Sequence, residues 1–156
     1  MARVEKHIEI EKPLRMVYDQ WTQFEEFPRF MEGVEEVRQL DDTTLHWVAK
    51  IGGKREEWQS EIVHQIPDQS IAWRHRAGAI NSGVVLFTPL DANRCRVTLA
   101  LEYDPQGFVE KVGDALGVVS RRVEGDLERF KRFIEERGSE TGAWRGEVHP
   151  GDAHPH

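Results

Sequence analysis

The chain has 156 residues, of which 38% are apolar and 31% are charged, and this length suits one domain with a substantial core. The formal net charge of -7, with Lys and Arg scattered among the acids, argues against a nucleic-acid-binding surface. Apolar runs such as 83–87 are too short to cross a bilayer, and residues 1–11 lack the apolar centre of a signal peptide. We therefore expect a cytoplasmic protein without stable membrane insertion.

The cysteine and histidine content argues against a metal site. The single cysteine, Cys95, excludes an intrachain disulfide and a multi-thiolate metal site. It shares a strand face with Val97, so a buried structural thiol is expected rather than a nucleophile. His149, His154 and His156 could bind a divalent metal weakly, but we favour accidental composition. We predict no metal and no cofactor.

The first part of the chain predicts a strand and two short helices. Residues Val4–Glu11 alternate between apolar and charged side chains, as in a half-buried strand. Pro13 suits the first turn of a helix, and Leu14–Trp21 then has one apolar face. A second short helix, rich in aromatic residues, is predicted over Phe24–Met31 and ends at Gly33.

Six strands joined by tight turns are predicted next. The first two cover 34–40 and 45–51, and the second ends at the loop Gly52-Gly53, which tolerates a positive φ at both positions. This loop would place Trp47 opposite Trp58, a cross-strand contact worth about 0.5–1 kcal/mol.

The following hairpin decides where two histidines lie. A two-residue loop at 68–69 would place His64 opposite Trp73, and His75 opposite Ile62. The two imidazoles would then be diagonal neighbours on the buried face of the sheet.

Two further strands complete the predicted sheet. Residues 78–83 are predicted to form a flexible connection, and the alternation over 84–89 leaves the faces of the next strand open. Residues 95–103 form a long alternating strand.

The last predicted element is a long helix over residues 108–136. Its apolar residues recur at the 3.6-residue period of an α-helix: Val112, Leu116, Val119, Val123, Leu127, Phe130 and Ile134. Gly113, Gly117 and Gly125 interrupt it. For Gly125 we favour a close approach to the sheet or a bend. For the other two, room for a ligand is an equal alternative.

The chain therefore divides into a domain over 1–137 and a tail over 138–156. The tail is rich in Gly, Ser, Thr, Pro and Asp, has no periodicity, and contains one large apolar residue, Trp144. We predict that it is mobile.

This order of elements predicts an α+β fold. A seven-stranded, curved antiparallel sheet would wrap around the long C-terminal helix, with the two short helices between the first and second strands. Two layers of this size need not close completely, which would leave an apolar cavity. The predicted lining is Trp47, Trp58, Ile62, His64, Trp73, His75, Leu99, Leu101 and Tyr103 from the sheet, and Val112, Leu116 and Val119 from the helix.

A set of residues spread along the chain carries a further signal: Val17-Tyr18, Trp21, Phe24, Phe27–Met31, Gly33-Val34, Gly52, Trp58, Glu61-Ile62, Pro67, Ile71–Arg74, Gly78, Gly83, Phe87, Pro89 and Tyr103. With these residues the chain resembles the polyketide cyclase/dehydrase group of the START-like (SRPBCC, helix-grip) superfamily. The resemblance covers about Arg3–Glu136. It implies the helix-grip fold and a hydrophobic cavity between sheet and long helix. Relatives include lipid carriers and aromatase/cyclases, but no universal catalytic motif can be placed on this chain.

Three functions remain open from the sequence. The first is binding of a small hydrophobic ligand (aromatic, polyketide-like or isoprenoid), with a solid tryptophan-filled core as the alternative. The second is an aromatase/cyclase or dehydratase acting on a polyketide-like substrate. His64 and His75 would be its acid/base residues and Tyr103 a proton donor, unless the histidines are hydrogen-bonded members of the wall. The third is an interaction module that uses the acidic surface or Trp144. Whether the chain is an enzyme or a homodimer is left open.

Overall fold

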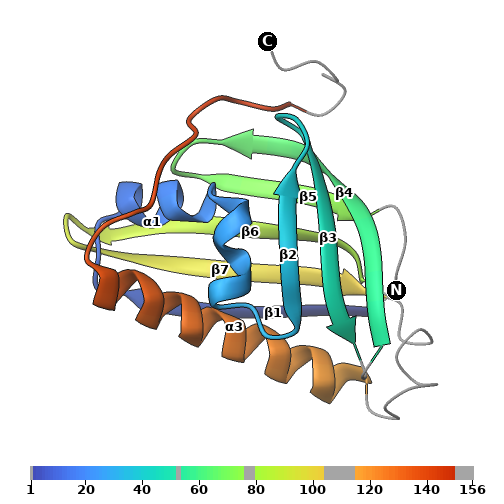
Figure 1. The fold of residues 1–156 in the computed structure, drawn as a ribbon. Coiled ribbons are helices and arrows are strands. Elements are labelled where there is room, and N and C mark those ends of the chain that lie inside the picture. Colours follow the sequence, from blue (N-terminus) through green and yellow to red (C-terminus); the bar gives the residue numbers. More distant parts are fainter. Residues whose placement is uncertain (1, 52–53, 76–79, 104–114, 150–156) are drawn as a thin grey trace.

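The computed structural model describes residues 2–51, 54–75, 80–103 and 115–149. Its main element is a seven-stranded antiparallel sheet with the strand order β1-β7-β6-β5-β4-β3-β2 (Figure 1). The strands are β1 (Ala2–Ile10), β2 (Val34–Gln39), β3 (Thr44–Ile51), β4 (Lys54–Ile66), β5 (Ser70–His75), β6 (Ile80–Asp91) and β7 (Arg94–Tyr103). The first strand pairs with the last one, and all other neighbours are consecutive in the chain.

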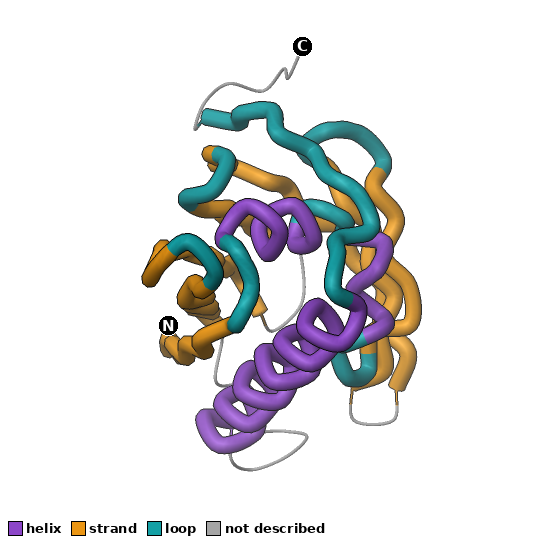
Figure 2. The backbone as a smooth tube through the Cα atoms, turned by 90° about the vertical axis from the view of Figure 1, so that its left-hand side faces the viewer, coloured by secondary structure: helices purple, strands orange, loops and turns teal. Residues whose placement is uncertain are grey.

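The helices lie inside the curve of this sheet (Figures 1 and 2). They are α1 (Leu14–Trp21), the 3₁₀-helix η1 (Phe24–Arg29) and α3 (Ala115–Arg137). The predicted α+β architecture, with two short helices between the first two strands, is confirmed. The predicted start of the long helix, 108–114, lies outside the described residues. No helix in the described part of the chain combines the length and the apolar character needed to span a membrane.

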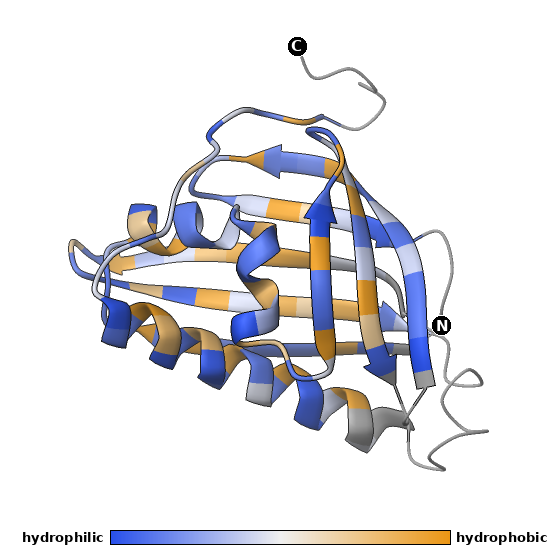
Figure 3. Ribbon diagram, viewed as in Figure 1, coloured by the Kyte–Doolittle hydropathy of each residue, from blue (hydrophilic) through white to orange (hydrophobic). Residues whose placement is uncertain are grey.

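The apolar stripe of α3 faces the sheet, as its period predicts. Figure 3 shows this stripe against the strands, and its members Val119, Val123, Leu127, Phe130 and Ile134 are all buried. The helix ends at Gly138, whose φ of 82° is in the left-handed region that favours glycine.

The polar edge of α3 attaches it to the β1 end of the sheet. Lys131 Nζ donates to the Glu9 carbonyl oxygen at 2.8 Å, and a Glu135 carboxylate oxygen accepts from the Glu11 backbone N–H at 2.8 Å. The helix is therefore held against one edge strand by polar contacts and by its buried stripe.

Aromatic rings join the short helices to α3. The Trp21 and Phe130 rings are 4.8 Å apart between centroids, and Phe30 lies 5.0 Å from Phe130, both in edge-to-face geometry. Phe27 continues the cluster to Trp47 on β3, at 5.7 Å. Such pairs add about 0.5–1.5 kcal/mol each beyond their burial. The cluster therefore connects the helices to β3 on the concave face.

Gly125 does not bring α3 close to the sheet. A Cβ atom built there would meet the Arg129 guanidinium at 2.9 Å, and its three nearest neighbouring atoms all belong to that side chain. A close approach to the sheet is therefore not the reason for Gly125, and the alternative interpretation, a bend in the helix, stays a prediction. Gly113 lies outside the described residues.

The pairing of β3 with β4 agrees with the prediction. Trp47 is opposite Trp58, and Ala49 is opposite Glu56. The alternation of apolar and polar residues on these strands was sufficient to set the register.

The predicted pairing of β4 with β5 is wrong. The loop spans three residues, 67–69, with Asp68 at a φ of 64°, and the ladder contains a bulge between Ile62 and His64. The observed pairs are Ile62 with Trp73, His64 with Ala72 and Ser60 with His75. A bulge adds one residue to one strand, so the residues beyond it change face.

Residues 139–149 do not match the predicted mobile tail, because they dock onto the domain. Val148 is 3% exposed and forms a β-bridge with Gln65 of β4, with backbone hydrogen bonds of 2.8 and 2.9 Å. The side-chain amide of buried Gln20 donates to the Thr141 hydroxyl at 3.1 Å and accepts from its backbone N–H at 2.8 Å. Trp144 packs against the core. This segment is held by hydrogen bonds and by one buried valine. Such contacts produce no periodic pattern in the sequence, so the sequence did not predict them.

Arg145 forms the polar centre of the docked segment. Its guanidinium bonds Asp19 of α1 and Asp68 of the β4–β5 loop, the latter at 2.7 Å, and lies 5.4 Å from the centre of the Tyr18 ring. The Asp19 side chain is only 5% exposed, and burial raises the pKa of its carboxyl above the ordinary value. The guanidinium therefore compensates a charge that burial disfavours.

Replacing Arg145 by Ala should lower the free energy of unfolding by about 2–4 kcal/mol, because Asp19 would remain buried without its partner. Denaturant unfolding measures the loss. Arg74→Ala is the matched control, since Arg74 pairs with Glu61 on the surface and should contribute less than about 1 kcal/mol. Adding Asp19→Asn to Arg145→Ala should recover part of the loss. Equal losses in the two arginine variants would contradict this role.

Candidate ligand-binding site

Two stacked tryptophans form the centre of the candidate site. The Trp47 and Trp58 rings are 5.9 Å apart between centroids and nearly parallel, at 5°. Cross-strand pairing of β3 with β4 places them side by side on the concave face. The Trp47 indole N–H donates to the Ser60 hydroxyl oxygen at 2.8 Å, so this buried polar group is satisfied.

His75 completes the cluster from β5. The Trp58 indole N–H donates to His75 Nδ1 at 2.8 Å, and the imidazole lies edge-on to both tryptophan rings. Burial lowers the pKa of His75 from its ordinary 6.5 to about 4. The imidazole is therefore neutral at pH 7.

A glycine on β6 makes room for the third tryptophan. Gly83 pairs with Trp73 on one side and with Leu101 on the other. A Cβ atom at Gly83 would lie 2.4 Å from the Trp73 ring and 2.8 Å from a Leu101 methyl group. The indole thus lies across the glycine, which belongs to a regular strand and not to the predicted flexible connection.

The concave face is not uniformly buried. Ile62 is 2% exposed and Trp47 is 7% exposed, whereas Trp58, Trp73 and His75 all remain partly exposed. These three rings therefore keep part of their surface accessible to solvent.

The remaining predicted lining residues divide into three groups. Leu99, Leu101, Tyr103 and Val119 are buried on β7 and α3. Val112 and the side chain of Leu116 lie outside the described part of the structure. His64 is the one described residue of the predicted lining that does not lie on the concave face, because the bulge moves it to the other face. Its neighbours Gln65 and Ile71 are fully buried, so His64 lies on the opposite face, with the His149 ring 6.2 Å away.

The structure therefore does not bring His64 and His75 together as acid and base. Tyr103, at the end of β7, pairs across the sheet with Ala2 and Ile80. Among the described residues, no group of three His, Cys, Asp or Glu side chains is arranged to hold a metal ion.

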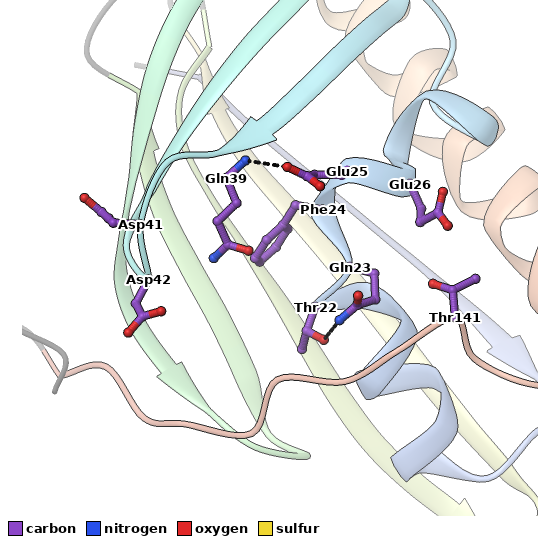
Figure 4. Close-up of a pocket in the computed structure, with 9 residues that line it drawn as sticks. All are labelled: Thr22, Gln23, Phe24, Glu25, Glu26, Gln39, Asp41, Asp42 and Thr141. Atoms are coloured by element: carbon purple, nitrogen blue, oxygen red, sulfur yellow. Dashed lines mark hydrogen bonds between the residues drawn. The ribbon is translucent and has the colours of Figure 1, made fainter.

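A polar pocket of about 580 Å³ lies elsewhere, between η1, the β2–β3 turn and the docked tail (Figure 4). Its lining is Thr22, Gln23, Phe24, Glu25, Glu26, Gln39, Asp41, Asp42 and Thr141. Glu25 accepts from the Gln39 backbone N–H at 3.1 Å, and Asp41 accepts from the N–H groups of Thr43 and Thr44. Two of its four carboxylates thus organise the local backbone. The acidic lining is unsuited to the apolar ligand that the sequence predicts.

Two residues important to the site were not recognised from the sequence. Ser60 accepts the Trp47 N–H, and Gly83 accommodates Trp73. A serine that alternates with Trp58 and Ile62 is a polar residue on an apolar face, and a glycine within a strand indicates a close approach. Both signals are present in the sequence.

The family model described as polyketide cyclase/dehydrase and lipid transport matches residues 10–132. The chain belongs to this family. A 17.2 kDa protein of Streptomyces lincolnensis, encoded between melC2 and rnhH and named as uncharacterized, is 51% identical to this family member over 149 residues. The match covers 95% of this chain and 99% of that protein. The resemblance stated from the sequence is confirmed.

Solved structures share the fold of this member of the polyketide cyclase/dehydrase family. DR_A0006 from Deinococcus radiodurans superposes with a TM-score of 0.66 at 30% identity, covering 88% of this chain and 99% of the other. The ZhuI aromatase/cyclase from Streptomyces sp. R1128 gives a TM-score of 0.72 at 19% identity, covering 92% and 99%. The similarity to ZhuI, at 19% identity, shows a shared fold only.

Gly83→Ala should destabilise the protein by about 1–3 kcal/mol, because the added methyl group displaces the Trp73 ring. Gly125→Ala is the matched control, since its methyl group meets the Arg129 guanidinium, which bonds Phe30 and Asp126, and no tryptophan. A helical alanine gains up to about 1 kcal/mol, which offsets part of the displacement of Arg129. Denaturant unfolding and the near-ultraviolet circular dichroism of the tryptophans report the difference. A Gly83→Ala protein with wild-type stability and spectrum would show that the strand adapts without moving the indole.

His75 should make stability depend on pH. The unfolded chain takes up a proton near the ordinary pKa of 6.5, and the folded protein only near 4. Between these values the unfolded state binds more protons, so the free energy of unfolding falls as the pH decreases from about 6.5 to about 4. The fall is on the order of 2–3 kcal/mol.

His75→Gln removes this titration and keeps an acceptor for the Trp58 N–H. The stability difference between wild type and variant, measured by urea unfolding at several pH values, should therefore change across this window. A difference that stays constant would refute the assignment.

Proposed function

We propose that the protein binds a small hydrophobic ligand between the concave face of the sheet and the C-terminal helix, against Trp58, Trp73 and His75. The observation that carries the proposal is the partial exposure of these three neighbouring rings on a face where most of the other apolar residues are buried. An aromatic, polyketide-like or isoprenoid compound suits this surface.

The chemistry of these side chains supports an apolar guest. Indole rings provide broad, flat contact surfaces with little conformational freedom to lose. His75 adds one polar group within hydrogen-bonding reach of a ligand on this surface, and ligand sites are commonly apolar with few polar groups. Membership of the polyketide cyclase/dehydrase and lipid transport family is consistent with this class of ligand.

An aromatase/cyclase or dehydratase is the second candidate, and the family favours it. The geometry weighs against acid–base turnover in two ways. His64 lies on the opposite face of the sheet, and the low pKa of His75 keeps its imidazole far from the value near 7 that suits a general acid or base. We therefore rank ligand binding first.

N-phenyl-1-naphthylamine, a probe that fluoresces in apolar surroundings, should bind the wild-type protein with increased emission. Trp58→Ala should weaken binding about 3- to 10-fold, the range expected for one aromatic contact. Leu86→Ala is the control, because Leu86 is 42% exposed on the other face of β6 and should leave the dissociation constant unchanged.

Native mass spectrometry of freshly purified protein would then identify a co-purifying compound. Unchanged probe emission in the wild type, or equal weakening in both variants, would contradict a ligand site at these rings.

A further inference from the structure

We propose that Trp58 fixes the tautomer of His75, so that the imidazole offers Nε2–H to the ligand and selects compounds that carry a hydrogen-bond acceptor. Such an acceptor is a ketone or quinone oxygen on an otherwise apolar skeleton. The inference rests on the ligand site proposed above and specifies the chemistry of its guest.

The hydrogen bond between Trp58 and His75 determines the tautomer. An indole N–H can only donate, so His75 Nδ1, at 2.8 Å, must accept with its lone pair. A neutral imidazole carries one ring proton, which must then reside on Nε2. That nitrogen is a donor and has no lone pair to accept from a ligand hydroxyl.

The surroundings of His75 also keep its imidazole neutral. A neighbouring carboxylate would favour the charged imidazolium, whereas burial lowers the pKa of His75 to about 4. Around neutral pH the site therefore presents a neutral N–H donor rather than a cation. A carboxylate forms its strongest hydrogen bonds with a charged donor, which this site does not offer. The neutral N–H therefore favours a ligand with an uncharged or weakly basic oxygen over a carboxylate.

The two stacked tryptophans differ in the acceptor that their indole N–H groups contact. The Trp47 N–H is directed to the Ser60 hydroxyl, and the Trp58 N–H to His75. Replacing either ring by Phe keeps an aromatic side chain in the stack. Only the change at Trp58 removes the bond to His75, so the chain itself provides a matched pair of variants.

Nitrogen-15 NMR of the histidine side chains tests the tautomer directly. In the wild type, His75 Nδ1 should show a pyridine-type shift and Nε2 a pyrrole-type shift. Trp58→Phe should move the two shifts toward one another as the second tautomer becomes populated, and Trp47→Phe should leave them unchanged. A pyrrole-type Nδ1 in the wild type would overturn the inference.

Binding of 1-tetralone and tetralin tests the selectivity, because the two compounds share a bicyclic skeleton and differ by a carbonyl group. The wild type should bind 1-tetralone about 2- to 10-fold more tightly, the value of one neutral hydrogen bond. His75→Phe should abolish the preference while tetralin still binds. Isothermal titration calorimetry or ligand-observed NMR gives both affinities.

Failure of this inference is distinguishable from failure of the proposed function. Equal binding of the two compounds by the wild type would overturn the selectivity and leave a ligand site in place. Binding of neither compound would overturn the ligand site and the selectivity together. A preference that survives in His75→Phe would assign the donor to another residue and overturn the role of His75.

Discussion

The packing of α3 against the β1 end of the curved sheet is the constraint on which the rest of the structure depends. One helix with a single apolar stripe covers part of the concave face, and its polar edge ties it to the backbone of β1 and of the residue that follows it. The face of β3, β4 and β5 must be covered by other means. Aromatic rings from α1 contact Phe87 on β6, and Phe27 of η1 contacts Trp47 on β3. On the two strands between them, β4 and β5, Trp58, Trp73 and His75 keep part of their surface exposed.

This arrangement explains why the polar groups of the concave face are paired with one another. An indole N–H buried against apolar rings requires an acceptor, and the strand pairing supplies Ser60 for Trp47 and His75 for Trp58. The same contacts hold the rings in fixed orientations. A surface organised before a guest arrives loses less entropy on binding, which favours recognition of rigid, flat molecules.

Regular patterns in the sequence were sufficient to predict the strand order in the chain, the burial of Cys95 and the pairing of Trp47 with Trp58, because alternation and short loops leave few registers. The position of His64 could not be predicted in this way. Asp68 adopts a left-handed conformation in a loop of three residues, and a bulge after Ile62 moves the following residues to the other face of the strand. The residue types at these positions do not predict either feature. The docking of residues 139–149 was also missed, because hydrogen bonds to Gln20 and a salt bridge to Asp19 follow no period.

The bond between Asp19 and Arg145 joins residues 126 positions apart. During synthesis on the ribosome, α1 emerges long before its counter-charge does. Until the chain has grown past Arg145, burial of Asp19 against the domain lacks this counter-charge. Final closure of this end of the molecule therefore requires both partners of the bond to be present together.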